Sequence, residues 1–205
     1  MPQIFECAQG TPEWLAARMG IPTASQFSTV MASGRGGKES ETRRKYMYDL
    51  VGEIITGEPT PNFSNSYTER GHVQEPDARN WYAFVEDVEP RQVGFIRNDR
   101  LNAGCSPDAL IGETGMLEIK TRLARLQLEL LFDGKLPSEH KAQCQGNLWV
   151  AEREWIDFVS YCPKIQPFKT RVHRDERYIA ELKVAVDHFN AELAELLPKA
   201  RRVAA

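Results

Sequence analysis

A short turn with an apolar run on each side is the feature of this chain that most restricts its fold. The runs Ala109–Ile111 and Met116–Leu117 flank the turn Gly112-Glu113-Thr114-Gly115. Short apolar runs separated by a glycine-containing turn are typical of a β-hairpin. The sequence therefore predicts two paired strands in the middle of the chain.

Charged residues lie at both outer ends of this predicted hairpin. Asp108 stands just before the first strand, and Glu118-Ile119-Lys120 continues the second. Because side chains alternate along a strand, we expect Glu118 and Lys120 on one face and Ile119 in the core. The hairpin would then bring two carboxylates and an ammonium group into one small volume.

This combination is typical of a site for a hard divalent cation. Mg²⁺ prefers oxygen ligands and is commonly bound by one or two carboxylates together with substrate phosphates. Asp108, Glu118 and Lys120 match, in order, the PD-(D/E)xK pattern of metal-dependent nucleases. The alternative is a turn aspartate after Pro107 and a solvated, charged strand face.

Composition favours one ordinary globular domain spanning residues 1–205, with 41% hydrophobic and 27% charged residues. No apolar run is long enough to span a membrane and no signal segment is visible, so we expect a cytoplasmic protein without membrane contact. The four cysteines have no metal-finger spacing. The net charge of −3 does not favour a protein that coats DNA.

Alternating helix and strand signals predict the α/β class, with a mixed central β-sheet flanked by helices. Thr11-Pro12 begins a helix that ends at Gly20, Thr23 opens a capping box, and Gly57 ends a strongly periodic helix. Further helices are expected over 67–84, 126–132, 140–150 and 176–197, with Pro76 disturbing the first of them. Strands are expected over 92–96, 101–105, 109–111, 116–120, 155–161 and 168–172.

Two further polar residues are candidates for the acidic site. Glu75 lies upstream in a predicted helix and would supply a third acid, and Gln143 lies in the helix that follows the hairpin. A glutamine beside a metal can orient a water or a phosphate. The alternative for both residues is an ordinary position on a helix surface.

Arg18 and Ser25 flank the first joint between helices and suggest an anion site. A helix N-terminus offers free N–H groups and the positive end of a dipole. Ser25 lies in the predicted first turn, and Arg18 would add a forked, charge-assisted contact. The alternative is that Ser25 only caps the helix and Arg18 pairs with a glutamate.

Taken together, the blocks resemble the phage lambda exonuclease family, the alkaline exonucleases of phage recombination systems. The resemblance runs from about Trp14 to the last helix. It rests on the order and spacing of four blocks: WLAARMGIPTAS, RGHVQEPDAR, AGCSPDALIGETGMLEIK and HKAQCQGNLWV.

The resemblance implies a restriction-endonuclease-like nuclease core and assigns roles to the acidic residues. Asp108 and Glu118 match the metal-binding acids, with the Ile119 carbonyl as a further ligand and Glu75 as the upstream acid. Lys120 matches the catalytic lysine. The helix glutamine of the site is Gln143. The implied cofactor is Mg²⁺, two ions per site, with Mn²⁺ as a substitute.

The resemblance also implies a pocket for a 5′-terminal phosphate. Arg18, Ser25 and Ser106 match the residues that bind this phosphate. A further arginine of the family's pocket follows the lysine after a proline-containing turn. Here the segment is TRLARLQ, so Arg125 is the predicted counterpart and Arg122 the alternative.

A strand-separating wedge is expected in the segment FSNSYTERG before Glu75. An apolar side chain inserted between base steps unstacks them. Tyr67 is the predicted wedge, Phe63 lies nearby, and the alternative is that Tyr67 packs under the loop.

The resemblance implies a 5′-to-3′ exonuclease that acts on double-stranded DNA ends with a 5′-phosphate. Such an enzyme releases 5′-mononucleotides and leaves a 3′ single strand for a single-strand annealing protein. A homotrimeric ring is also implied. Two alternatives remain: a PD-(D/E)xK endonuclease of repair or restriction type, and a non-catalytic DNA-end-binding accessory protein of recombination. The presence of all four residues Glu75, Asp108, Glu118 and Lys120 disfavours the second.

Overall fold

The computed structural model of the chain describes residues 1–34, 40–61 and 66–204, except for the side chains of residues 66–70 and 72. The strands are β1 (Gln3–Phe5), β2 (Phe95–Asn98), β3 (Ala103–Cys105), β4 (Ala109–Ile111), β5 (Gly115–Thr121), β6 (Trp155–Cys162) and β7 (Ile165–His173). The α-helices are α1 (Pro12–Arg18), α2 (Phe27–Val30), α3 (Glu41–Thr56), α4 (Ser66–Glu86), α5 (Ala124–Asp133), α6 (Lys141–Val150) and α7 (Glu176–Ala204). Short 3₁₀ helices cover η1 (Ala24–Gln26) and η3 (Ser138–His140).

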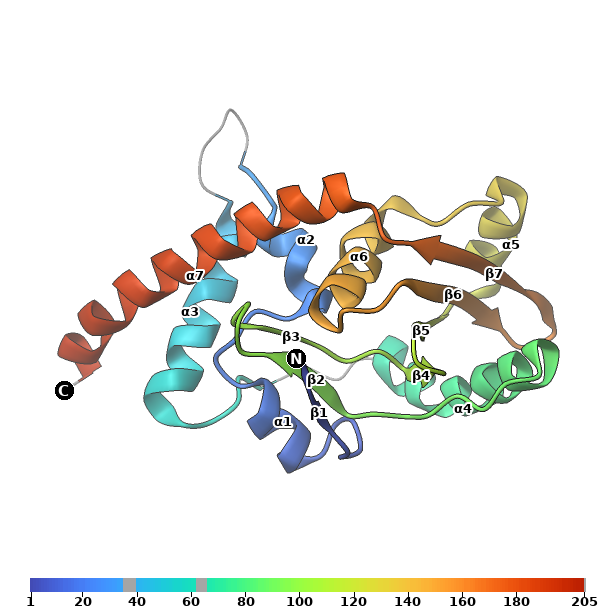
Figure 1. Cartoon of the computed structure of the whole chain (residues 1–205), viewed down its shortest axis with the longest axis horizontal. Helices are drawn as coiled ribbons and strands as arrows, with labels where there is room; N and C mark the ends of the chain where they lie inside the picture. The colour runs from blue at the N-terminus through green and yellow to red at the C-terminus, as the bar shows by residue number, and fades with distance from the viewer. Residues whose placement is uncertain (35–39, 62–65, 205) are drawn as a thin grey trace.

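The strands form two sheets (Figure 1). The larger has the order β4-β5-β6-β7 and is mixed, because β5 and β6 run parallel while the outer pairs are antiparallel. The smaller sheet has the order β1-β2-β3 and is antiparallel. The predicted β4–β5 hairpin and the predicted α/β class with a mixed, helix-flanked sheet are therefore confirmed.

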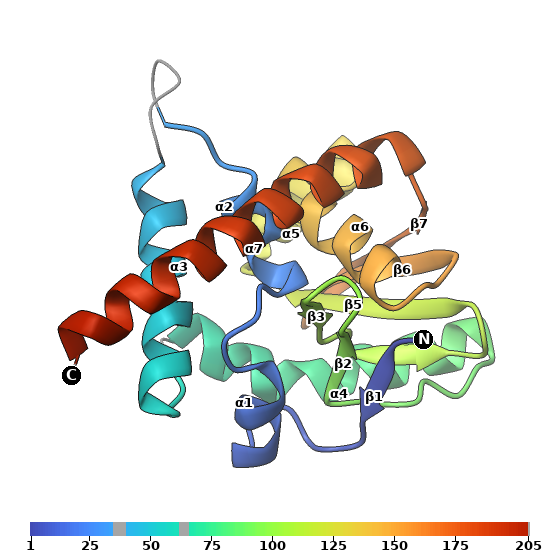
Figure 2. The same ribbon diagram turned by 60° about the vertical axis from the view of Figure 1, so that its left-hand side comes forward.

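Helices cover both faces of the larger sheet. Met116, Ile156 and Phe158 pack into the main core with α6 and α7. Leu117, Ile119 and Val159 point the other way and pack against Ala78 and Tyr82 of α4. The strict alternation along β5 thus places even-numbered residues toward α6 and odd-numbered ones toward α4. Figure 2 shows α7 crossing α3 at the edge of the molecule.

Several predicted boundaries change for physical reasons. α4 continues through Pro76. The proline removes only one backbone hydrogen bond, and Ala78 and Tyr82 pack the helix against the sheet, which outweighs that loss. The predicted capping box at Thr23 is wrong: its side chain makes no capping bond, and Ala24–Gln26 forms a 3₁₀ turn. α7 runs seven residues past the predicted end at 197, to Ala204.

The smaller sheet also differs from the prediction. β2 begins at Phe95 rather than at 92, and the unpredicted strand β1 pairs with it. Gly94 lies so close to Cys7 that a Cβ there would stand 2.3 Å from the Cys7 carbonyl oxygen. The segment before β2 therefore packs closely against the N-terminal segment and is not part of the β1–β2 ladder, which begins at Phe95. In the described part of the chain, no helix is both long and apolar enough to cross a membrane.

Candidate active site

The segment between β3 and β4 turns Asp108 toward β5. The Asp108 amide donates to the Leu117 carbonyl at 3.0 Å, which extends the β4–β5 pairing by one residue. In return, the Ile119 amide donates to Asp108 Oδ2. On the other side of the segment, Gln9 Nε2 donates to the Pro107 carbonyl at 3.1 Å. These contacts place the Asp108 carboxylate beside the middle of β5.

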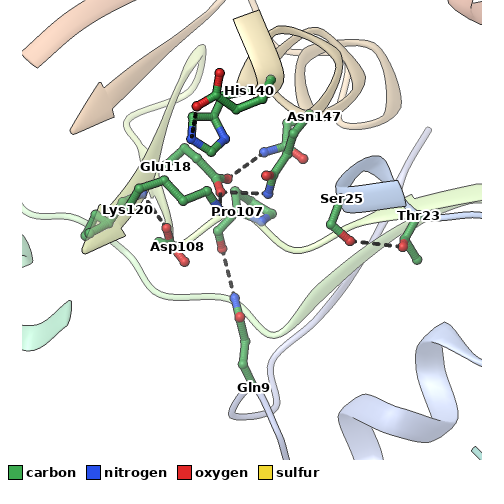
Figure 3. A network of polar contacts seen from close by, with 12 residues as sticks. Gln9, Thr23, Ser25, Pro107, Asp108, Glu118, Lys120, His140 and Asn147 are labelled. Carbon is green, nitrogen blue, oxygen red and sulfur yellow. Dashed lines mark hydrogen bonds and ion pairs between the residues drawn. The ribbon is translucent and has the colours of Figure 1, made fainter. Parts of the chain in front are cut away.

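Glu118 lies on the face of β5 that points toward α6, and it is 2% exposed. Lys120 Nζ and Gln143 Nε2 each donate to its Oε1 at 2.6 Å. Asn147 Nδ2 donates to its Oε2 at 2.9 Å. Figure 3 shows Glu118 between Lys120 and Asn147, with Asp108 close by. The predicted shared face of Glu118 and Lys120, with Ile119 on the opposite, buried side, is confirmed.

The carboxylates of this group repel one another. Burial raises the pKa of Asp108 well above its usual value, and the nearby charges of Glu118 and Glu75 raise it further. For Lys120, burial is the largest influence and lowers the pKa. The attraction of Glu118 and Asp108 outweighs it, so the pKa of Lys120 is raised. In the absence of metal, Lys120 is thus a cation beside an excess of carboxylates.

Arg18, at the end of α1, is a partly buried cation, in contrast to the carboxylates at Asp108 and Glu118. Its guanidinium stacks over the Trp14 ring, 4.2 Å from the centroid. Burial lowers the pKa of Arg18, against the raising effect of Tyr46 and Glu53. Among the described residues, no hydrogen bond or ion pair of this guanidinium is found. Its N–H donors are therefore available to an anion.

Trp14 also connects Arg18 to Ser106. The indole Nε1 donates to Ser106 Oγ and to the Gly94 carbonyl, both at 2.9 Å. Ser25 is exposed, and its Oγ lies 3.3 Å from Thr23 Oγ1. The Thr23 amide donates to the Tyr46 hydroxyl at 3.1 Å, so the joint between α1 and η1 is tied to α3.

A single cavity of about 200 Å³ joins these two groups of side chains. Its lining includes seven of the predicted catalytic and phosphate-binding residues: Arg18, Ser25, Ser106, Asp108, Glu118, Lys120 and Gln143. Gln9, Trp14 and Thr23 complete the wall. The residues come from the β1–α1 connection, α1, η1 and the residue before it, the β3–β4 connection, β5 and α6.

Glu75 lines a neighbouring cavity instead of this one. It forms an ion pair with Arg79, one turn later in α4, and both line a cavity of about 640 Å³. Gln9 belongs to the walls of both cavities. Glu75 is close enough to raise the pKa of Asp108, but its carboxylate is engaged elsewhere.

The donor set fits a hard divalent cation that also binds substrate. Among the described residues, no three histidine, cysteine, aspartate or glutamate side chains gather into a complete metal site. Two carboxylates, those of Asp108 and Glu118, line the cavity as oxygen ligands. Mg²⁺ needs few protein carboxylates when phosphate oxygens complete its coordination. The raised pKa of Asp108 means that its carboxylate form is disfavoured here, and a bound cation would stabilise that form.

Besides Glu75, two further candidate residues are not brought to this pocket. Arg125 is exposed on α5 and pairs with Glu129 at 2.5 Å. Arg122 donates to His140 Nε2 at 2.7 Å and lines a different cavity. The side chain of Tyr67, the predicted wedge, and all of Phe63 lie outside the described residues.

Asn147, Trp14 and Gln9 complete the site without having been predicted as members. Asn147 follows Gln143 by four residues, which places both on one face of α6. That spacing was a usable signal, because a helix that presents one site glutamine presents its i+4 neighbour too. Trp14 has the same spacing to Arg18. Nothing local in the sequence points to Gln9, whose role depends on the fold.

Comparisons with known proteins identify the family of the chain. Residues 13–154 match the family model of the YqaJ-like viral recombinase domain. The structure of an alkaline exonuclease (LHK-Exo) from Laribacter hongkongensis is 35% identical, with a TM-score of 0.85, covering 95% of this chain and 98% of that one. A structure of LHK-Exo in complex with dAMP is 36% identical, with the same TM-score and coverage.

A phage related exonuclease from Haemophilus somnus 129PT shares the fold, with a TM-score of 0.65 at 14% identity, over 88% of this chain and 96% of that one. A comparison with curated proteins finds no match. The family match covers well over half of the chain, from α1 through α6. The chain therefore belongs to the YqaJ-like viral recombinase domain family, as its resemblance to the phage lambda exonuclease family predicted.

Proposed function

We propose that this protein is a Mg²⁺-dependent 5′-to-3′ exonuclease that acts on double-stranded DNA ends. It releases 5′-mononucleotides and leaves a 3′ single-stranded overhang for recombination by strand annealing. The observation that supports this proposal best is the shared cavity. One wall carries Arg18, Ser25 and Ser106, and the other carries Asp108, Glu118 and Lys120.

The charges of the two walls favour a phosphate together with a cation. Burial lowers the pKa of Arg18, so an anion beside it would restore the preference for the charged guanidinium. Burial and neighbouring acids raise the pKa of Asp108, so a cation would restore the preference for its carboxylate. A terminal phosphate and Mg²⁺ satisfy both walls at once.

Asp108, Glu118 and the Ile119 carbonyl would bind Mg²⁺, and Mn²⁺ is expected to substitute. When bound, two such ions supply an activated water and neutralise charge on the scissile phosphate. Glu75 joins this ligand set if its ion pair with Arg79 opens.

The side chains of the pocket would orient the reacting groups. Lys120 is within hydrogen-bond distance of Glu118 and, as an ammonium, can orient the attacking water or stabilise a phosphoryl oxygen. Gln143 donates one amide hydrogen to Glu118, and its second is available to water or phosphate. Arg18, with Ser25 and Ser106, would bind the 5′-phosphate and set the register of cleavage.

Assembly and partners are part of the same proposal. A 23.3 kDa protein that digests many nucleotides in one encounter needs a topological link to its substrate. A homotrimeric ring with cyclic symmetry provides one, and a single-strand annealing protein would receive the exposed 3′ strand. Sedimentation equilibrium tests the ring: a monomer or dimer that digests processively would rule it out.

The test of the proposed activity uses three substrates in parallel: linear duplex with 5′-phosphate ends, the same duplex with 5′-hydroxyl ends, and closed circular duplex. With Mg²⁺, we expect mononucleotide release from the first, slower release from the second and none from the third. Chelation of the metal should stop all release. Cleavage of the circle would instead indicate an endonuclease. DNA-end binding without any cleavage would indicate an accessory protein.

A further inference from the structure

Helix α6 donates to both oxygens of Glu118 from two successive turns. Gln143 bonds Oε1 at 2.6 Å and Asn147 bonds Oε2 at 2.9 Å. The two donors are four residues apart and share one face of the helix. Together they fix the rotation of the carboxylate about its last side-chain bond.

The two oxygens differ in their surroundings. Oε1 is shared by Lys120 and Gln143, which both line the candidate active-site cavity. Oε2 accepts from Asn147, which is 1% exposed and is not part of the cavity wall. Asn147 therefore contacts Glu118 from behind, on the side away from the cavity.

The other end of the Asn147 amide has no partner among the residues that the structure describes. Its Oδ1 is buried, and none of these residues donates a hydrogen bond to it. A buried, unpaired acceptor destabilises a fold, whereas leucine, of similar volume, would fill the same space without one. The asparagine is thus not the side chain that packing alone would favour, and its N–H bond to Glu118 is the contact that distinguishes it from leucine.

We propose that Asn147 is a positioning residue that orients Glu118 for metal binding. By holding Oε2, it keeps Oε1 turned toward the cavity, where the metal and substrate would bind. This inference rests on the proposed role of Glu118 as a metal ligand. Partners that orient metal ligands typically change metal affinity by 10- to 100-fold when removed.

Two substitutions separate positioning from packing. Asn147→Leu fills the space but removes the donor. Asn147→Ala opens a cavity in which a water can donate to Oε2. Positioning therefore predicts that the leucine variant loses more metal affinity than the alanine variant. Packing predicts the reverse order, since alanine leaves the larger void.

The probe is Mn²⁺, titrated into each protein and followed by the electron paramagnetic resonance signal of the free ion. We expect the Mn²⁺ dissociation constant to rise about 10- to 100-fold in Asn147→Leu and less in Asn147→Ala. Melting temperatures without metal verify folding. The matched control is Gln145→Leu on the same helix, α6. Gln145 donates to the His173 carbonyl and accepts from the Asp175 amide, and the substitution breaks both part-buried bonds. It should weaken the fold but not Mn²⁺ binding.

Wild-type affinity in both Asn147 variants would overturn the inference. So would a greater loss in Asn147→Ala than in Asn147→Leu, or an equal loss in Gln145→Leu. Each of these results leaves the metal role of Glu118 standing. A wild-type protein that binds no Mn²⁺ would overturn that role, and the inference with it.

Discussion

Two buried acids stand on adjacent parallel strands and face opposite sides of the larger sheet. Glu118 of β5 points toward α6, and Asp157 of β6 points toward α4. Each accepts three hydrogen bonds from neighbouring side chains. Asp157 accepts two bonds from Arg171 and one from Tyr82, all at 2.7 or 2.8 Å. The number of hydrogen bonds therefore does not distinguish a structural acid from a candidate catalytic one.

What distinguishes them is the surplus of charge and the open space beside Glu118. Arg171 neutralises the charge of Asp157, and its guanidinium stacks over the Trp155 ring, 3.7 Å from the centroid. Glu118 has Lys120 as its cation, but it shares that cation with Asp108. It also borders a cavity, whereas Asp157 is fully buried. An excess of acid next to a cavity marks a place for a cation.

The largest expected effect is on the rate of nucleotide release, when residues next to Glu118 are replaced. Removal of a group that transfers or orients a proton typically reduces the rate by about 10²–10⁴-fold. We expect Lys120→Ala to lose that much nucleotide release, and Asp108→Ala at least as much, with folding and DNA-end binding preserved. The measurement is the rate of release from 5′-phosphorylated duplex with Mg²⁺. Near-normal cleavage by either purified variant would remove that residue from the reaction.

The second prediction is that substitution of Asp157 has the opposite effect, on stability and not on activity. Asp157→Asn should leave nucleotide release per folded molecule unchanged but destabilise the protein. Loss of one partner of a buried ion pair costs about 3–5 kcal/mol. Because the Arg171 side chain is 43% exposed, we expect the lower end, about 3 kcal/mol. Denaturant unfolding measures this change. An inactive but fully stable variant would show that the contrast between the two acids is wrong.

The third prediction extends the comparison to the cations. Arg18 and Arg171 both stack on a tryptophan, but only Arg171 has a carboxylate partner among the described residues. Charge-assisted bonds to a phosphate are worth about 1.5–3 kcal/mol, or roughly ten- to a hundredfold in rate. Arg18→Ala should therefore lose that factor on 5′-phosphate ends and much less on 5′-hydroxyl ends.

Arg125→Ala is the matched control, because Arg125 is exposed and paired with Glu129. It should leave the preference for 5′-phosphate unchanged. If it erases that preference, Arg125 has the phosphate-binding role that its position after Lys120 predicted, and α5 must move on DNA binding. Equal losses by Arg18→Ala on both kinds of end would show that the phosphate pocket is misplaced.

The smallest expected effect concerns pH. Burial lowers the pKa of His140 to about 4, and the charges of Lys120 and Arg122 add to this. A histidine with a lowered folded-state pKa binds fewer protons in the folded than in the unfolded state. Its contribution to stability is complete above pH 6.5 and is lost as the pH falls toward 4.

We therefore expect His140→Gln to reduce the fall in unfolding free energy between pH 6.5 and pH 4. After a discount for partial solvent exposure, the difference should be about 1 kcal/mol. Denaturant unfolding at a series of pH values, in the absence of divalent metal, measures it. Parallel curves for the two proteins would mean that His140 titrates normally.

The sequence predicts the parts of this fold that depend on local chemistry. Pro12 at the start of α1, Gly57 at the end of α3 and the turn between β4 and β5 act on their immediate neighbours. β1 escapes prediction because its three residues have no clear alternation and gain their conformation from pairing with β2. α4 continues through Pro76 because packing on the sheet outweighs one missing backbone bond.

The residues of the candidate site also divide into those placed by local sequence and those placed by the packing of distant segments. Asp108, Glu118 and Lys120 are visible because a single hairpin brings them together over twelve residues of sequence. The bond from Asn147 to Glu118 spans 29 residues and depends on how α6 packs on β5. The contact of Gln9 with Pro107 spans 98 residues. The ion pair between Glu75 and Arg79 follows i, i+4 spacing, so the sequence predicts it. The sequence does not predict whether this ion pair opens.

In the function proposed above, one cavity binds the 5′-phosphate on one wall and the catalytic metal on the other. The most direct measurement is a crystal structure of the Lys120→Ala variant with Mg²⁺ and a 5′-phosphorylated DNA duplex. We expect the terminal phosphate against Arg18, Ser25 and Ser106, and metal density between Asp108 and Glu118. A terminal phosphate bound outside this cavity, or metal ligated without Asp108 and Glu118, would contradict the account.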